Sequence, residues 1–352
     1  MASFTSSLQP VCYSSELTGF SCFTSAGAVT VRMYAVENIF ENTYRSDGYF
    51  MFPDYSDIIE NFMIQNEVPV IDLNIEVADD NSTATQTVRV LFYKAMNLTY
   101  LAEEMLDSGM LTTYRNRTLY NDFDDYITLW CPQGHAEIGS YISYALLMAD
   151  DHGNQEWITL QTMQTIHEGL NEVRIFHAYL RGEIPSQYQN WRKICMLFRF
   201  NGRTCTFYFS QAHAVKRFAY RNCFNALEYL SIPCTSTKKV KTDHSVAVCG
   251  KYQYLYDIVH ERTHVEQTAA LDSERCLAME QLLTSPTVKV QLDDYNEEAI
   301  IITSYTYEPS NEPNTERSFK FEWQFQYRNG VTLHTPVQEN RLFSRHFMPQ
   351  FS

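Results

Sequence analysis

The feature that most constrains this chain is a strictly alternating aromatic segment, residues 319–328. Successive side chains of a β-strand point to opposite faces, so this pattern places all its aromatic rings on one face. Burial of each ring is worth roughly 1.5–3 kcal/mol, so the face contributes on the order of 10 kcal/mol. Asn329-Gly330 follows directly and predicts a tight type I′ hairpin turn. The segment favours a β-rich structural or binding protein, with five rings on the buried face: Phe319, Phe321, Trp323, Phe325 and Tyr327.

Composition narrows the class of protein. A length of 352 residues allows two or three domains, each with its own core. With 45% hydrophobic and 20% charged residues, the chain has the balance of an ordinary globular protein. The net charge of −15 opposes binding to a phosphate backbone, so no nucleic-acid partner is expected.

Cysteine usage and the N-terminus indicate the compartment. Nine cysteines, an odd number with no C-x-x-C pair, predict buried free thiols in a reducing compartment. The first residues lack a basic region followed by an apolar run, so no signal peptide is expected. No apolar stretch reaches the roughly 18 residues that a spanning helix needs, so no membrane association is expected.

Strand and turn signals predict a mainly β fold, with sandwich or barrel domains and a few short helices. Its last domain is expected to be α+β, with one helix on an antiparallel sheet. The expected regions are an extended N-terminal arm at 1–24, a β-sandwich at 25–95, a helical linker at 96–115, a second β-rich domain at 116–209, and a C-terminal β domain with one helix at 210–352.

Three local predictions anchor this division. A helix is expected over 54–64, followed by a hairpin of strands at 68–77 and 85–93. The helix in the linker should end at Gly109, because glycine adopts the left-handed conformation that ends many helices. Asp272 should cap a helix through Leu283.

The strongest chemical motif is His260-Glu261-Arg262-Thr263-His264, a match to H-E-x-x-H. On a helix the two histidines would bind Zn²⁺ and the glutamate would polarise a bound water, as in a zinc metallopeptidase. The β-branched and aromatic residues before it indicate a strand, where the two histidines stand roughly 13 Å apart. No third ligand follows at a usual spacing, so we expect a polar strand face and assign no catalytic, cofactor or metal residues.

Other polar clusters are weaker signals. Four acidic groups could bind Ca²⁺ but lack the EF-hand pattern, so solvated turns are the better interpretation. The basic run at 238–241 is typical of an edge strand that avoids aberrant pairing. Exposed aromatic rings could stack on sugars, which leaves carbohydrate binding open. The acidic groups lie at Asp79-Asp80, Asp122 to Asp125, Asp150-Asp151 and Asp293-Asp294.

Six segments of the chain share their patterns with a known group of proteins: Tyr220–Leu230, Leu271–Val290, Ala299–Ser304, Phe319–Tyr327, Asp54–Phe62 and Thr87–Tyr93. In these segments the chain resembles virion structural proteins from phages and prophages of gut Bacteroidales. The resemblance implies a tail or baseplate component whose copies assemble around a symmetry axis. It also implies a strand, with no metal, at the position of His260–His264.

The sequence thus favours a non-enzymatic virion protein, a tail, baseplate or neck–tail adaptor or hub that forms a symmetric ring. It would be assembled in the cytoplasm of a bacterial host, with its own copies and neighbouring virion proteins as partners. The alternatives are a carbohydrate-binding module of the same particle and, less favoured, a zinc metallopeptidase.

Overall fold

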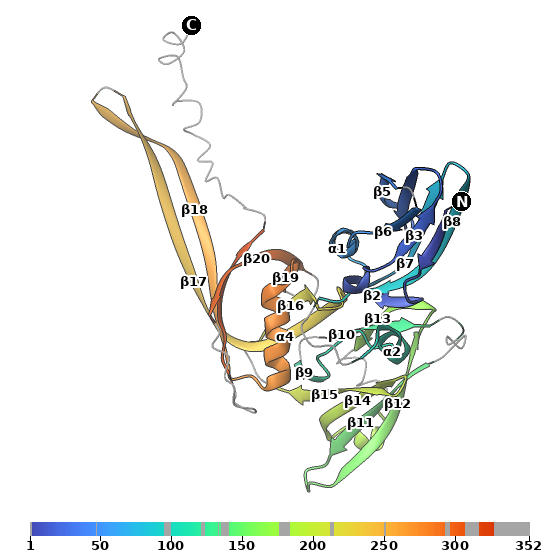
Figure 1. Ribbon diagram of the computed structural model, residues 1–352. Coiled ribbons are helices and arrows are strands. Elements are labelled where there is room, and N and C mark those ends of the chain that lie inside the picture. The colour runs from blue at the N-terminus through green and yellow to red at the C-terminus, as the bar shows by residue number, and fades with distance from the viewer. Residues whose placement is uncertain are drawn as a thin grey trace.

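The computed structural model shows three β-rich units and one long projecting hairpin (Figure 1). The mainly β prediction is confirmed. The residues that the structure describes are 2–46, 48–94, 100–120, 124–132, 134, 141–175, 184–211, 215–249, 251–292, 296–306 and 317–326.

The N-terminal unit consists of two sheets that share a core with helix α1 (Ser56–Gln65). The predicted helix and hairpin are confirmed, because β7 and β8 join through a tight turn in which Asp79 pairs with Ser82. One sheet has the order β1 (Ser3–Ser6), β3 (Ser21–Thr24), β6 (Gly48–Met51). The other has the order β2 (Val11–Tyr13), β8 (Ser82–Leu91), β7 (Val70–Asp79), β4 (Ala28–Tyr34), β5 (Asn38–Arg45).

The prediction of an extended arm at 1–24 is wrong. These residues form β1, β2 and β3 and the short 3-10 helix η1 (Ser14–Glu16) of the N-terminal unit. Leu17, Phe20 and Cys22 are almost fully buried in its core. The strands are only three or four residues long, and β1 and β3 are rich in Ser and Thr, so the apolar positions are too few to reveal a periodicity.

The middle unit is built from two further sheets around a second core. A two-stranded sheet pairs β10 (Asp125–Cys131) with β13 (Gly169–Ile175). The 3-10 helix η2 (Ser186–Tyr188) lies between β13 and β14. The five-stranded sheet has the order β12 (Gln155–Thr165), β11 (Tyr141–Ala149), β14 (Arg192–Phe200), β15 (Arg203–Ser210), β9 (Asn116–Tyr120).

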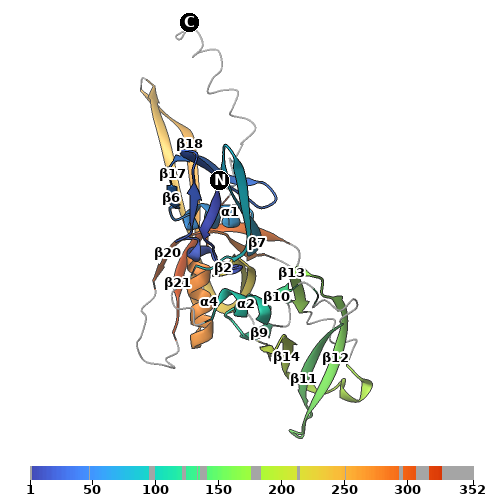
Figure 2. The ribbon, with the colours of Figure 1, turned by 45° about the vertical axis from the view of Figure 1, so that its right-hand side comes forward.

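The C-terminal unit is a closed barrel with helix α4 (Ser273–Thr284) packed against its core (Figure 2). Asp272 caps α4 by accepting a hydrogen bond from the backbone N–H of Arg275 at 2.9 Å, as predicted. Phe319, Phe321 and Trp323 are buried in the barrel core, which confirms the predicted aromatic face there. The barrel order is β16 (Val215–Arg221), β17 (Leu227–Cys249), β18 (Tyr252–Thr268), β21 (Lys320–Phe325), β20 (Glu297–Thr306), β19 (Val288–Gln291).

Three further predictions concern turns and thiols. Helix α2 (Ala102–Ser108) ends at Gly109, whose φ of 72° is left-handed, as predicted. The Asn329-Gly330 turn lies outside the described residues. Eight cysteines are buried and free, as predicted for the described part of the chain. The boundaries drawn at 95, 115 and 209 between predicted domains stay predictions.

Candidate functional site

The three units meet at the turn Asn222–Ala226, which links β16 to β17. The Asn225 side chain donates to the backbone carbonyls of Met63 and Val68 in the N-terminal unit, at 2.7 and 3.1 Å. The Asn222 side chain donates to the Leu111 carbonyl at 2.8 Å. One turn of the barrel unit therefore holds backbone from both neighbouring parts of the chain.

Apolar packing surrounds the same turn. Phe224 is 1% exposed and lies in a small core with residues of β2, β8 and α2. Its ring stands 5.5 Å from that of Tyr93, centroid to centroid. This core joins the units in addition to the hydrogen bonds.

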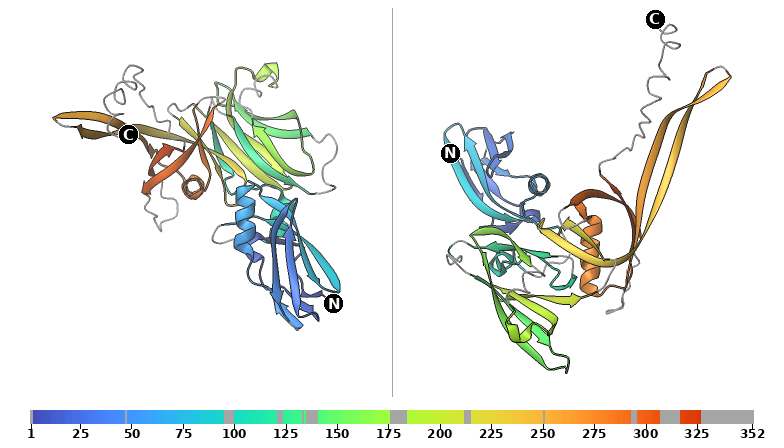
Figure 3. Two further views of the ribbon diagram at one scale, coloured as in Figure 1. Left: turned by 90° about the horizontal axis from the view of Figure 1, so that it is seen from above. Right: turned by 180° about the vertical axis from the view of Figure 1, so that it is seen from behind.

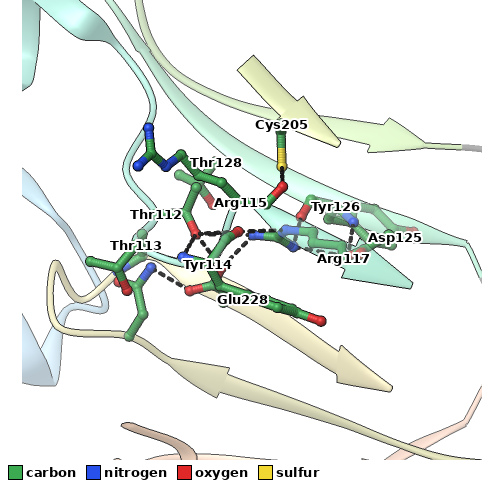
Figure 4. A network of polar contacts seen from close by, with 12 residues as sticks. Thr112, Thr113, Tyr114, Arg115, Arg117, Asp125, Tyr126, Thr128, Cys205 and Glu228 are labelled. Carbon is green, nitrogen blue, oxygen red and sulfur yellow. Dashed lines mark hydrogen bonds and ion pairs between the residues drawn. The ribbon is translucent and has the colours of Figure 1, made fainter. Parts of the chain in front are cut away.

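Arg117 of β9 lies at the centre of a buried polar network beside the turn (Figure 4). Its guanidinium donates to Asp125 at 3.1 Å and forms an ion pair with Glu228 of β17. It also donates to the Tyr114 and Tyr126 carbonyls and to the Thr112 hydroxyl at 3.0–3.1 Å. These partners use all five N–H donors of arginine, so the group is fully satisfied without water.

The electrostatics of this pair follow from its burial. The side chains of Arg117 and Glu228 are 1% and 2% exposed. Burial lowers the pKa of Arg117, but attraction to Asp125 and Glu228 more than offsets this and leaves it raised. Burial raises the pKa of Glu228, and Arg117 with hydrogen bonds from Thr112 and Asn222 offsets only part of the rise. The network fixes the middle unit to the barrel.

A cavity of about 380 Å³ lies beside the turn. Its lining includes Arg221, which pairs with Glu67, and Gln281, which donates to Thr113 at 2.9 Å. The polar groups around it thus serve the junction already.

The second feature is the hairpin of β17 and β18, which extends far beyond the barrel (Figures 1 and 3). From Cys234 to Cys249, β17 pairs only with β18 among the described residues. The other edge of β18 pairs with β21 at His264–Gln267, and over Tyr252–Thr263 it has no partner strand in the described part of the chain. The projecting half therefore has two open edges, and its described side chains lie on the surface, with Val240 58%, Val246 50% and Val248 70% exposed.

A buried carboxylate anchors the base of the hairpin. Glu266 of β18 is 0% exposed. It accepts hydrogen bonds from Trp323 Nε1 at 3.1 Å and from Ser236, and it forms an ion pair with Lys216. The His264 ring stacks on Trp323 at 4.0 Å, and burial, followed by Lys216, lowers its pKa.

The H-E-x-x-H motif lies within strand β18, as its context predicted. His260 is paired with Thr242 and His264 with Lys238 across the hairpin. A strand spaces residues i and i+4 roughly 13 Å apart, which does not fit one zinc ion. Among the described residues, no group of three His, Cys, Asp or Glu side chains is placed to hold a metal ion.

The predicted acidic clusters fall mainly in turns. Asp79 accepts hydrogen bonds from the backbone N–H groups of Asn81 and Ser82, and Asp150 accepts from those of His152 and Asn154. Asp124 pairs with Arg174, and Asp125 with Arg117. Asp122 and Asp293-Asp294 lie outside the described residues.

An exposed aromatic patch covers the outer face of the β1–β3–β6 sheet. Phe23 and Tyr49 are 37% and 78% exposed, with ring centroids 5.3 Å apart. Met51 lies beside them at 74% exposure, and it is paired with Ser21, whose hydroxyl is 2.8 Å from that of Thr5. Exposed aromatic rings with hydroxyl groups beside them can stack on a sugar ring and form hydrogen bonds with it.

Sequence reasoning missed the junction. The signal was present in Glu228, a carboxylate within the apolar strand 226–232, and in Arg117 beside Leu119 and Tyr120. A buried charge needs a partner, but nothing in the sequence says which of 42 acidic residues pairs with Arg117.

No family model matches the chain, and no curated protein matches it. Among solved structures, it is similar to a chain from the tail of an empty GTA particle with C6 symmetry. The identity is 14% and the TM-score 0.23, over 34% of this chain and 96% of that one. The likeness is to a particle tail, and nothing in it bears on a Bacteroidales origin. Within the described residues, no helix is long and apolar enough to cross a membrane.

Proposed function

We propose that this chain is a non-enzymatic virion structural protein that assembles with copies of itself into a ring of a tail, baseplate or neck–tail junction. The observation that carries the proposal is the projecting β17–β18 hairpin, whose two edges have no further partner strand in the part of the chain that the structure describes. A two-stranded hairpin is marginally stable by itself in water, and open edges accept further strands. The edge of β17 and the edge of β18 are different surfaces, so pairing one with the other is head-to-tail and generates a ring when the rotation closes.

The rigid junction supports the same role. A ring closes only if every copy has the same shape, so that each contact between copies repeats with the same rotation. The Arg117 network and the Asn222–Ala226 turn hold the three units in one arrangement. The placement within a particle of gut Bacteroidales phages rests on the sequence resemblance and belongs to this proposal.

Native mass spectrometry of the full chain tests self-assembly and bound metal together. We expect a closed oligomer without metal. A monomer at high protein concentration would contradict ring formation, and a monomer with one stoichiometric zinc would favour the peptidase.

A shortened hairpin locates the contact. Val240 and Arg262 are directly opposite, so Asn-Gly can replace residues 241–261 as a two-residue turn. The barrel core is untouched, so the variant should fold as the wild type does. It loses most of the length of both strand edges, so its association should be weaker than that of the wild type. As a matched control, Asn-Gly replaces the β11–β12 turn residues 150–154, which should leave the oligomer intact.

Carbohydrate binding is the second candidate, because the Phe23–Tyr49 patch is exposed. A glycan array with full-length protein tests it, with Tyr49→Ala as the variant and Tyr305→Ala, an exposed tyrosine of β20, as the control. Glycan binding that is lost in Tyr49→Ala but kept in Tyr305→Ala would support a host-recognition role.

A further inference from the structure

The two faces of the projecting hairpin differ in charge balance. On one face, Lys239 Nζ lies 2.6 Å from Glu322 Oε1 and Lys241 Nζ lies 2.8 Å from Asp243 Oδ2. Glu261 is directly opposite Lys241, and directly opposite residues share a face. The lysines of this face are therefore neutralised within the hairpin and the barrel.

The opposite face carries unbalanced positive charge. Lys238 is directly opposite His264, and Arg262 precedes His264 by two residues, so the three share a face. Lys238 and Arg262 are exposed, and neither forms an ion pair within the described part of the chain. The nearby carboxylate of Glu266 is buried and already binds Lys216, Ser236 and Trp323.

His264 lies on the same face as these positive charges, and one of its ring nitrogens has no hydrogen-bond partner in the described part of the chain. This atom, Nε2, is buried. Burial lowers the pKa of His264 most, and Lys216, Lys238 and Arg262 lower it further. An anion placed here would offset several positive charges at once.

Charge is distributed unevenly along the chain. Residues 1–93 contain twelve Asp and Glu but only three Lys and Arg. The hairpin, residues 234–265, contains five Lys and Arg and three Asp and Glu. Opposite fields on two parts of one molecule favour association of the positive part of one copy with the negative part of another.

We propose that the hairpin face formed by Lys238, Arg262 and His264 binds the acidic N-terminal unit of a second copy of this chain. The inference rests on the proposed self-assembly and adds a second contact between copies, beside the pairing of the hairpin edges. Carboxylates of the partner would accept hydrogen bonds from Arg262 and Lys238. A second copy supplies the negative partner within the chain itself, because its residues 1–93 carry twelve acidic and only three basic residues.

Carbodiimide cross-linking of the full-length oligomer tests the contact directly. The reagent joins a lysine amine to a carboxylate that touches it. In an equal mixture of ¹⁴N and ¹⁵N protein, mixed-isotope peptides mark links between copies. We expect such links from Lys238 to Asp or Glu within residues 1–93. Links from Lys238 to carboxylates of other regions only, in an intact oligomer, would overturn the proposal.

Charge reversal supplies the second test. Lys238→Glu with Arg262→Glu should weaken association at least tenfold at low ionic strength, and the difference from wild type should shrink as salt screens the contact. The control is Arg192→Glu with Arg199→Glu, two exposed cations on β14 of the middle unit with the same change in charge.

The outcomes separate this proposal from the proposed function. A wild-type chain that stays monomeric contradicts the ring itself. A wild-type oligomer that the reversed pair leaves unchanged, at every salt concentration, overturns only the charged contact. Retention of duplex DNA by the wild type, lost in the reversed pair, would assign the face to a polyanion and also overturn it.

Discussion

The junction and the hairpin differ in the environment of their charged residues, which are buried and paired in the first and exposed in the second. At the junction every N–H of Arg117 has a partner and the carboxylates around it are buried. On the projecting hairpin, Lys238 and Arg262 are exposed, and neither strand edge has a further partner strand among the described residues. The polar groups of the junction bond to one another and stabilise the fold, whereas those of the hairpin are exposed and accessible to a partner. A stable molecule that assembles needs both.

The largest expected effect comes from breaking the junction. Arg117→Met leaves Glu228 and Asp125 buried without their cation, which should cost about 3–5 kcal/mol in the free energy of unfolding. Chemical denaturation measures it. The control is Arg174→Met: this side chain is 45% exposed and pairs with Asp124, so its loss should cost less than about 1 kcal/mol. Equal losses for the two variants would show that the junction is not the stronger anchor.

Gly109 offers a second way to damage the junction. Its φ of 72° disfavours any side chain, and an added Cβ would meet the Trp130 carbonyl at 2.7 Å and the Phe200 ring. Gly109→Ala should therefore cost about 2–3 kcal/mol. At Gly153, with φ 86° and nothing within 4 Å, the same change should cost only about 1–2 kcal/mol. Thermal unfolding of both variants gives the difference, and no difference would mean that the site relaxes freely.

The base of the hairpin should respond to pH. The folded-state pKa of His264 lies below its unfolded value, so protonation favours the unfolded state. The neutral ring therefore contributes to stability above about pH 6.5, the ordinary pKa of an unfolded histidine. This contribution is lost as the pH falls from there towards the lower pKa of the folded state. Lys216, Lys238 and Arg262 add to the effect, and Glu266 opposes it. Unfolding at pH 7 and pH 5 should show a smaller loss in His264→Phe than in wild type.

The smallest effect on stability is expected at the far end of the hairpin. Val248 is 70% exposed, so Val248→Glu should change the free energy of unfolding by less than about 0.5 kcal/mol. The same substitution should weaken assembly if the hairpin is the contact, which sedimentation velocity measures. The buried Val77 is the matched control, because Val77→Glu should prevent folding of the N-terminal unit. A large stability loss at Val248 would mean that the hairpin belongs to the core.

Local patterns predicted much of the secondary structure. Alternation located β7, β8 and β21, and capping chemistry located the start of α4 and the end of α2. Alternation failed for the first 24 residues, because strands of three or four residues do not repeat long enough to be recognised. The strand setting of H-E-x-x-H was readable from its neighbours, since β-branched and aromatic residues disfavour a helix.

The sequence by itself determined the longer strands, such as β7, β8 and β21, and which of their faces are apolar, because side-chain direction follows from local backbone geometry. Only the tertiary structure decided that Arg117 pairs with Glu228, 111 residues away, and that one turn joins three units. It also decided that β17 and β18 leave the barrel together and expose a cationic face. Partner choice over such separations depends on how sheets pack against one another, and no local pattern encodes it.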